Sequence, residues 1–449
     1  MKAKSCSDFC RTQAAYAGNG LPSIEPGMPD PAGTGLDRRG FLLRSTGLAL
    51  SVYGGMGLGP GAYEEAIASA SGGGQRVLIS VFLPGGLDAL SFLAPVADPV
   101  YQSARPTLKL AANPAHTFAD DSRLQWHPDA LPFKALHEAG KMAVFPAIGY
   151  SDANQSHFTS RHFWETGSLD FNANRGWLGR YLDIAGDPEN PLQGLSLGWT
   201  LSPALATGSM PVASFSRPTD YEFWAHGLGS PVSEKLFDTY GALGQGATTD
   251  PALATARRVA RHTDSVRRSM EPLVDATIQS QATYPTGALF PEQLAALAEM
   301  LERGLPIRCV AIEGHGGYDT HSGQAATLSS NLEVTAASIA AFQQDLEARG
   351  LADRVLIQVW SEFGRRVNQN GDGTDHGAAG VALLIGSHVQ RQMVGEWPGL
   401  TSLDEDDNML HTSDFRVMYA AIVDQWLNAD AAAIIPGADQ MTLPTLLAA

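Results

Sequence analysis

The segment EGHGGYDTHSGQ, residues 313–324, contains two histidines, an aspartate and four glycines, and it directly follows the apolar run IRCVAI. Histidine and aspartate side chains bind divalent metal ions and transfer protons, while glycines allow the backbone to turn sharply or approach a ligand closely. A tight turn with incidental polar groups would have the same composition. Whether this loop does chemistry therefore depends on whether similar residues stand at comparable positions elsewhere in the chain.

Polar residues of the same kinds do stand at the ends of other predicted elements. In open α/β sheets, ligands bind beyond the carboxyl ends of the strands. Seven acidic or histidine residues and one serine occupy such element ends: Asp88, Ser156, Asp319, His321, Glu362, Asp375, His376 and His411. A set of this size favours a shared site over unrelated turns.

The elements that must position these residues are predicted from apolar runs. Such runs recur at 76–86, 141–149, 307–314, 354–364 and 379–387, and they are continuous rather than alternating. Continuous runs are typical of parallel strands buried on both faces. Between the runs lie helical patterns such as 325–348, which ends before Gly350. The sequence therefore predicts a doubly wound, mostly parallel α/β sheet with helices on both faces.

The domain organisation is predicted to be simple. Residues 75–449 are expected to form one domain, and we find no internal repeat. The segment at about 186–260 is rich in Pro, Gly and Ser and has no clear period, so it is interpreted as an insertion or lid over one face.

Composition excludes several classes of partner. The 449 residues carry a formal net charge of −17, so the long-range field repels nucleic acid and anionic membrane surfaces. Of three cysteines, Cys6 and Cys10 lie near the N-terminus, which leaves Cys309 alone within an apolar run. A lone cysteine there is expected to be a buried, inert thiol.

Residues 1–70 are interpreted as a leader with a twin-arginine export signal. Arg38 and Arg39 precede Phe41 and a weakly apolar stretch, and Ala68 and Ala70 supply an A-x-A cleavage site. The apolar stretch is too short and too rich in Gly and Ser for a stable membrane span. We therefore expect the twin-arginine machinery to export the protein, already folded, to the periplasm or beyond.

The chemistry that uses such a set of residues is metal-assisted ester hydrolysis. Two divalent ions about 3.5–4 Å apart can activate an oxygen nucleophile and stabilise the leaving oxygen. Ser156 is the candidate nucleophile, because it follows the apolar run 141–149 and begins the helix-compatible segment SHFTSRHFWETG. It would lie near helix-start N–H groups that favour anions. Its alternative role is a helix N-cap, and the two roles are compatible.

The segments LPGGLDAL, SHFTSRHFWETG, GGYDTHSGQ, WSEFGRR and GTDHGAAG, with the twin-arginine leader, resemble the secreted bacterial domain-of-unknown-function family 1501 over nearly the whole mature chain. That family is similar to the alkaline phosphatase superfamily, which includes sulfatases and phosphomutases. The resemblance implies a parallel sheet, a Ser, Thr or Cys nucleophile and metal ligands at strand ends. It assigns one ion to Asp88, Asp375 and His376 with Ser156, and a second ion to Asp319, His321 and His411.

Some assignments stay open. The superfamily usually spaces its aspartate and histidine by four residues, so His315 is an alternative to His321 as the partner of Asp319. Glu362 ends a predicted strand where the superfamily often has an Asp-His pair, and it therefore competes with Asp375 for one role as a metal ligand. The Cys-x-Pro-x-Arg motif of formylglycine sulfatases is absent from the sequence, which argues against a classical sulfatase mechanism.

The sequence thus predicts an exported metal-dependent hydrolase of phosphate or sulfate esters, with a small-molecule or polysaccharide ester as substrate. Ser156, His157 and Arg365 are the candidate catalytic residues, with Arg365 or Arg366 expected to clamp the anion. The mixed carboxylate–imidazole set is compatible with Zn, Mg, Mn or Ca.

Two other functions are possible. One is a non-catalytic secreted protein that binds metal or a partner on a hydrolase scaffold. The other is a serine esterase using Ser196 in GLSLG, although this segment lacks the strand–turn–helix pattern of esterases.

Overall fold

The computed structural model of this chain describes residues 75–221, 230–274 and 278–448. The predicted leader, with Arg38 and Arg39, lies outside these residues, so its interpretation stays a prediction. Within the described part, none of the helices combines the length and apolar character that crossing a membrane requires.

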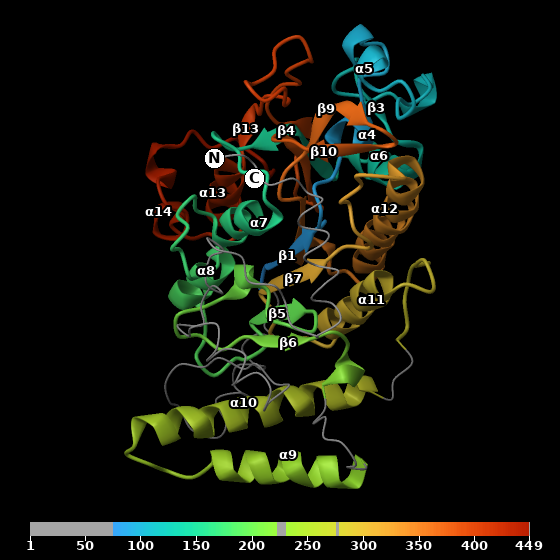
Figure 1. Ribbon diagram of the computed structural model, residues 1–449. Helices are drawn as coiled ribbons and strands as arrows, with labels where there is room; N and C mark the ends of the chain where they lie inside the picture. The colour runs from blue at the N-terminus through green and yellow to red at the C-terminus, as the bar shows by residue number, and fades with distance from the viewer. Residues whose placement is uncertain (1–74, 222–229, 275–277, 449) are drawn as a thin grey trace.

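A nine-stranded sheet forms the centre of the molecule (Figure 1). Its order is β12-β4-β11-β8-β1-β7-β5-β6, with β13 also paired to β4. The pairings of β11 are antiparallel and all the others are parallel. The strands are β1 (Val77–Phe82), β4 (Met142–Gly149), β5 (Gly194–Leu197), β6 (Ala213–Phe215), β7 (Cys309–Glu313), β8 (Val355–Trp360), β11 (Gly380–Ile385), β12 (Gln392–Met393) and β13 (Ser413–Asp414). The five apolar runs are thereby confirmed as β1, β4, β7, β8 and β11.

Helices cover both faces of the sheet, which confirms the doubly wound prediction (Figure 1). In β1, Val77, Ile79 and Val81 pack into one hydrophobic core, and Leu78 and Phe82 pack into the other, because successive side chains point to opposite faces. The first core includes α6 (Leu131–Glu138), α11 (Leu289–Glu302) and α12 (Gln324–Ala348). The second includes α7 (His157–Thr166), α8 (Trp177–Ala185), α13 (Phe415–Gln425) and α14 (Ala431–Ile434).

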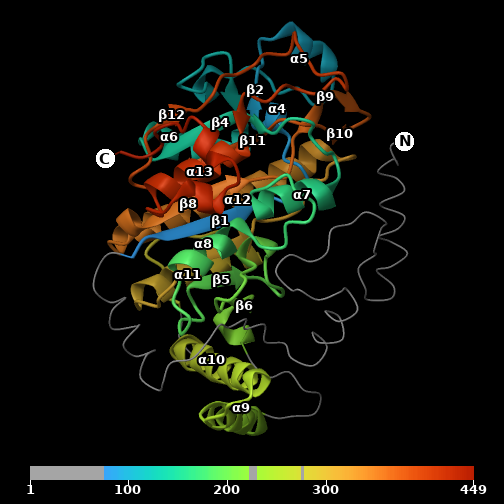
Figure 2. The ribbon, with the colours of Figure 1, turned by 90° about the vertical axis from the view of Figure 1, so that its left-hand side faces the viewer.

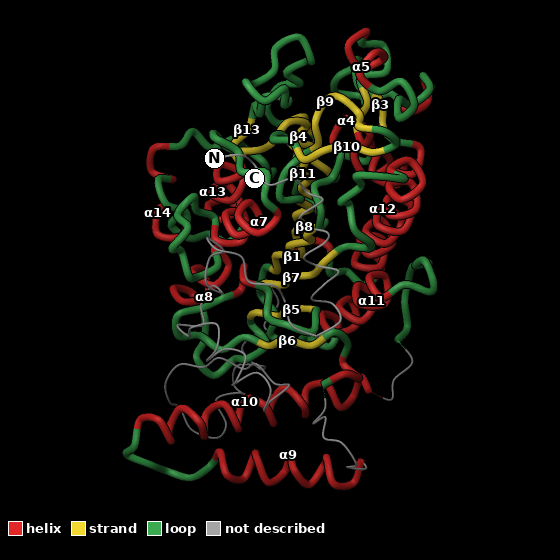
Figure 3. Tube along the Cα trace, viewed as in Figure 1, coloured by secondary structure: helices red, strands yellow, loops and turns green. Residues whose placement is uncertain are grey.

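Shorter elements complete the fold (Figure 3). Two small antiparallel sheets pair β2 with β3 and β9 with β10. The short elements are α4 (Ala89–Phe92), β2 (Leu93–Ala94), α5 (Pro99–Ala104), η1 (Pro114–His116), β3 (Gln125–Trp126), η2 (Pro128–Ala130), η3 (Pro203–Leu205), η4 (Pro218–Asp220), η5 (Ala352–Arg354), β9 (Arg365–Asn370), β10 (Gly373–His376) and η6 (Ala438–Gln440).

The segment predicted as an insertion over 186–260 contributes to the sheet, which corrects that interpretation in part. It contains β5 and β6, which extend the sheet beyond β7. These strands escape sequence analysis because they are only 4 and 3 residues long and contain Gly or Ser. Helices α9 (Ser230–Gly244) and α10 (Pro251–Val274) then form a hairpin that projects beyond the β6 edge (Figure 2).

Two sequence interpretations concern residues inside the sheet. Ser196 lies within β5, and its hydroxyl donates to the Thr200 carbonyl at 3.0 Å, which is not the strand–turn–helix position of an esterase serine. Cys309 begins β7 and is fully buried, and burial raises the pKa of its thiol to about 12. The thiol is therefore protonated at physiological pH, as expected for an inert cysteine.

The topology brings five chain segments to one edge of the sheet. Strands β1, β4, β7 and β8 run in the same direction, so the loops that follow them emerge together. Strand β11 runs the opposite way, so the segment that precedes it arrives at the same edge. These five segments carry the residues singled out at the element ends, except His411, which precedes β13.

Candidate functional site

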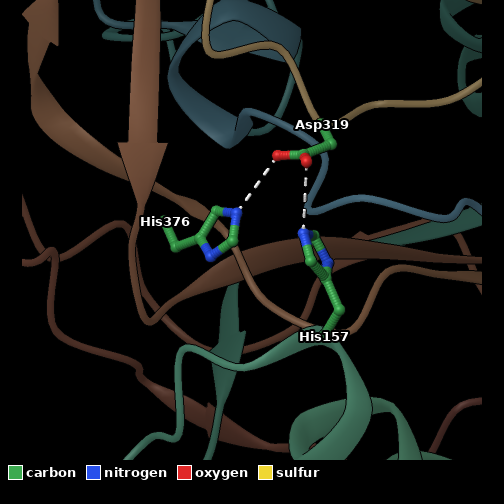
Figure 4. Close-up of side chains that lie close together, drawn as sticks. All are labelled: His157, Asp319 and His376. Carbon is green, nitrogen blue, oxygen red and sulfur yellow. Dashed lines mark hydrogen bonds and ion pairs between the residues drawn. The ribbon is translucent and has the colours of Figure 1, made fainter. Parts of the chain in front are cut away.

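His157, Asp319 and His376 meet at this edge, with one ligand atom from each lying within 4.8 Å of the others (Figure 4). We call these three residues the metal cluster, meaning the group of side chains that could hold one metal ion. His157 is the first residue of α7, Asp319 lies in the loop after β7, and His376 ends β10. Two imidazoles and a carboxylate form a donor set that suits a divalent ion.

Asp319 is the centre of the metal cluster. Its Oδ1 lies 3.0 Å from His321 Nε2 and 3.1 Å from His376 Nε2, and it accepts a hydrogen bond of 2.6 Å from Arg365 Nη2. Its Oδ2 lies 3.4 Å from His157 Nε2. Burial alone would raise the pKa of Asp319, but its contacts with the three histidines and Arg365 hold it far below its usual value. Asp319 therefore carries a negative charge.

Glu362 fixes the orientation of His157. Its Oε1 lies 2.7 Å from His157 Nδ1, and the backbone N–H groups of Gly85 and Gly86 donate to its carboxylate at 2.9 and 3.2 Å. Burial would raise the pKa of Glu362, but the hydrogen bond with His157, the charge of His157 and the backbone N–H donors together lower it. An ionised carboxylate can only accept, so His157 donates from Nδ1 and directs Nε2 towards Asp319.

Glu362 was predicted as a metal ligand, and the structure places it behind His157 instead. Burial would lower the pKa of His157, yet its hydrogen bonds with Asp319 and Glu362 raise that pKa to about 9. A carboxylate that holds the far nitrogen of an imidazole is the usual outer partner of a metal-binding histidine. The position of Glu362 is that of an orienting residue.

His376 is oriented in the same way by a backbone carbonyl. Its Nδ1 lies 2.8 Å from the carbonyl oxygen of Gln155, which can only accept, so Nδ1 carries the proton. In the neutral ring, Nε2 then presents a lone pair towards Asp319 Oδ1 and towards His321 Nε2, at 3.1 Å from each. Lone pairs that face a carboxylate oxygen repel it unless a proton or a metal ion lies between them. This arrangement fits a cation.

Arg365 differs from its predicted role as an anion clamp. Its side chain is fully buried, and it donates to the carbonyls of Gly86, Thr374 and Tyr318 at 3.0, 2.8 and 3.1 Å, as well as to Asp319. Each of the three guanidinium nitrogens therefore already donates a hydrogen bond. Arg365 holds Asp319 and the backbone around Gly86, Tyr318 and Thr374 in place. Arg366 is only half-buried and donates to the His376 carbonyl at 3.3 Å.

Asp88 lies apart from the metal cluster, which differs from its predicted role as a ligand. It is buried and pairs with Arg105 through bonds of 2.6 and 3.1 Å, and Ser91 and Gln324 also donate to it. Burial would raise the pKa of Asp88, but Arg105 lowers it. Asp88 also caps α4 by accepting from the Leu90 N–H.

We predict that Asp88→Asn destabilises the fold by about 3–5 kcal/mol, because it leaves the Arg105 charge buried without a counter-ion. Metal content should stay at the wild-type value. Urea denaturation and elemental analysis measure the two effects. Asp430→Asn is the matched control, since the exposed residue Asp430 caps helix α14 and asparagine caps equally well. Loss of metal from a stably folded Asp88→Asn protein would restore Asp88 as a ligand.

The other predicted residues occupy different positions. Ser156 is exposed at the N-cap position of α7, between Gln155 and His157, and its side chain makes no cap hydrogen bond. Asp375 lies 3.4 Å from His321 Nδ1, so it borders the cluster. His411 lies next to Gly149 at the end of β4, and it is not among the cluster residues in the described chain.

Sequence analysis missed the backbone groups that organise the site. The Gln155 carbonyl and the two glycine N–H groups have no side-chain signature. The pair of glycines in LPGG was the available signal, because Gly85 has φ of 112° and a Cβ there would lie 2.3 Å from the Asp319 nitrogen. Only glycine permits this close approach of two loops.

Comparison with known proteins confirms the family resemblance. The family described as "Protein of unknown function (DUF1501)" matches residues 237–424. No curated protein matches the chain.

Three of the solved structures to which the chain is similar illustrate the likeness. A protein in the alkaline phosphatase superfamily from Vibrio parahaemolyticus is 10% identical, with a TM-score of 0.35, covering 88% of this chain and 74% of its own. The phosphonate monoester hydrolase SpPMH from Silicibacter pomeroyi is 13% identical, with a TM-score of 0.34 and coverages of 81% and 75%. The C-terminal periplasmic domain of EcEptC from Escherichia coli, in complex with Zn, is 8% identical, with a TM-score of 0.35 and coverages of 82% and 89%.

Proposed function

We propose that this protein is an exported, metal-dependent hydrolase of phosphate or sulfate esters, with Ser156 as its nucleophile. The observation that carries the proposal is the convergence of His157, Asp319 and His376 at one edge of the sheet. Both histidines donate from Nδ1 to fixed oxygens and turn Nε2 towards an ionised carboxylate. That is the arrangement of metal ligands held by a second layer of hydrogen bonds.

These three residues would hold the divalent ion, with His321 and Asp375 beside it. The imidazole and carboxylate donors suit Zn or Mn, and they do not exclude Mg or Ca. Sequence analysis predicted two ions, and the described residues bring together one cluster of this kind. A bound ion would supply positive charge that stabilises the ester oxygens as bonds change.

The surroundings of Ser156 support its role as the nucleophile. Its neighbours on both sides are fixed, because the Gln155 carbonyl accepts from His376 and the His157 ring is held by Glu362. Its side chain is exposed at the start of α7, where the helix N-terminus favours an anionic ester. The Ser156 oxygen would bond to phosphorus or sulfur as the alcohol oxygen leaves, and water would then release the acid and restore the hydroxyl.

Arg366 is the remaining candidate for contacting the anion, because the guanidinium nitrogens of Arg365 are occupied. Arg366 is half-buried and lies beside His376 through the bond to its carbonyl. A guanidinium can bind two oxygens of a phosphate or sulfate group at once.

Elemental analysis of the exported protein, followed by a panel of phosphate, phosphonate and sulfate esters with and without chelator, tests the proposal. We expect a divalent metal to co-purify, at least one ester to be hydrolysed, and chelator to abolish the reaction. A metal-loaded protein that hydrolyses no ester of the panel would instead favour a binding protein on a hydrolase scaffold.

Export is predicted to depend on Arg38 and Arg39. The Arg38→Lys, Arg39→Lys double variant should accumulate as precursor in the cytoplasm, because the twin-arginine pair is the signal for transport. Cell fractionation and immunoblotting measure this distribution. Arg44→Lys, which lies in the same leader but outside the pair, should be exported normally. Normal accumulation of the double variant outside the cytoplasm would contradict the twin-arginine interpretation.

A further inference from the structure

A pocket of about 390 Å³ has a volume within the size range of small-molecule sites. Three of the chain segments that line it also carry His157, Asp319 or Glu362. On α7, Arg161 lines the pocket one helical turn after His157. In the loop after β7, Gly314 lines the pocket and Asp319 belongs to the cluster, while at the end of β8 Trp360 precedes Glu362. The pocket and the cluster are therefore neighbouring parts of one surface.

The one arginine in the pocket is paired with two carboxylates. Arg161 Nε donates to Glu165 at 2.9 Å, its Nη2 donates to Glu313 at 2.9 Å, and its guanidinium lies 4.4 Å from the centre of the Phe82 ring. Glu165 is buried, whereas the Glu313 side chain is 57% exposed. An arginine held between two carboxylates offers donors and acceptors side by side without a net positive charge. Such a wall suits a neutral ligand with adjacent hydroxyl groups better than an anion.

Trp199 adds a flat apolar surface to the same pocket. It is 77% exposed, the largest exposed fraction among the large hydrophobic side chains that the structure describes as exposed. Leaving an indole in water forgoes a substantial burial free energy, so a solvent-facing tryptophan at a pocket marks a contact surface. An indole face beside paired donors and acceptors matches a sugar ring, whose C–H groups form one flat face and whose hydroxyl groups form the rim.

We infer that this pocket binds a neutral sugar unit of the substrate, with Trp199 against the face of the ring and Arg161 and Glu313 at its hydroxyl groups. The position given to the ester group of this substrate rests on the proposed function. His157 and Arg161 are separated by about 6 Å along the helix axis. A sugar in the pocket would thus direct an attached phosphate or sulfate group towards Ser156 and the metal cluster.

Saturation-transfer NMR on the purified full-length protein tests sugar binding without requiring turnover. The probes are cellobiose, maltose, lactose and N,N′-diacetylchitobiose. We expect at least one to receive saturation, strongest at the ring C–H protons that face the indole. In titrations of that sugar, Trp199→Ala should weaken binding by about tenfold or more, since it removes the stacking surface. Glu313→Gln should weaken it less, because the amide keeps one acceptor oxygen.

Phe171→Ala is the matched control, because Phe171 is another exposed aromatic residue, 49% exposed, and it lies outside the pocket. Its affinity for the sugar should equal that of the wild type. The inference is overturned if no disaccharide receives saturation, or if Trp199→Ala binds the sugar as tightly as the wild type. Failure of the ester panel alongside intact sugar binding would remove the hydrolase proposal and leave the sugar site standing.

Discussion

His157→Ala and His376→Ala are each expected to lose most of the bound metal and, with it, ester hydrolysis. Each change removes one of the three residues that would hold the ion. The loss should exceed the roughly 10–100-fold fall in metal affinity expected for Glu362→Gln, which disturbs only the orientation of His157. Elemental analysis measures the metal content of each variant, and competitive titration with a chelator ranks their metal affinities.

His388→Ala is the matched control, because His388 is an exposed histidine near Asp353, away from the cluster. It should keep wild-type metal content. His411→Ala discriminates between the two pictures of the site, since sequence analysis made His411 a ligand and the structure leaves it outside the cluster. Retained metal in both cluster variants, with folding confirmed by circular dichroism, would show that the ion binds elsewhere.

Ser156→Ala is expected to abolish turnover while leaving the protein folded and metal-loaded. If Ser156 forms the covalent intermediate, turnover should fall by at least about three orders of magnitude, because no other group replaces the lost oxygen. Stability should change by less than about 0.5 kcal/mol, because the exposed Ser156 side chain makes no cap hydrogen bond. Steady-state kinetics on the best ester of the panel and thermal melting measure the two quantities.

Ser151→Ala is the matched control for this variant. Ser151 is an exposed serine in the same loop before α7, so its removal should change neither turnover nor stability. Hydrolysis by Ser156→Ala at the wild-type rate would exclude the covalent mechanism. A water molecule would then be the nucleophile, and the exposed position of Ser156 would have no catalytic meaning.

The sheet was largely predictable because its central strands are buried on both faces. Such strands read as unbroken apolar runs, and β1, β4, β7, β8 and β11 were all found in this way. Strands β5 and β6 were missed because short segments such as GLSL and ASF carry too few side chains to establish a pattern. Their place in the sheet is determined by packing against β7, which is tertiary information.

The candidate site was predictable only where side chains carry the signal. Asp319, Glu362 and His376 stand out by residue type at element ends, and the structure brings them together with His157, which was predicted as a catalytic residue and not as a ligand. Asp88 has the same signature, but Arg105, 17 residues later, pairs with it. Nothing in the sequence distinguishes a carboxylate that will meet an arginine from one that faces a metal.

The backbone contacts explain the other difference between the predicted and observed sites. Arg365 was predicted from the sequence to bind an anion, but its guanidinium donates hydrogen bonds to the carbonyls of Gly86, Thr374 and Tyr318. Every residue carries such a carbonyl, so the pairing appears only once the loops are folded.

The reversed direction of β11 also has a consequence for biosynthesis. This strand is inserted between β4 and β8, although it follows both in the chain. The segment before it holds His376, whose ring contacts a carbonyl 221 residues earlier. A nascent chain that has not yet emerged as far as the end of β10 lacks one of the three proposed ligands. Contacts between such distant segments form late in folding. On the proposed function, metal acquisition would therefore follow the assembly of these distant segments, and a bound ion would mark a chain whose sheet has formed around β11.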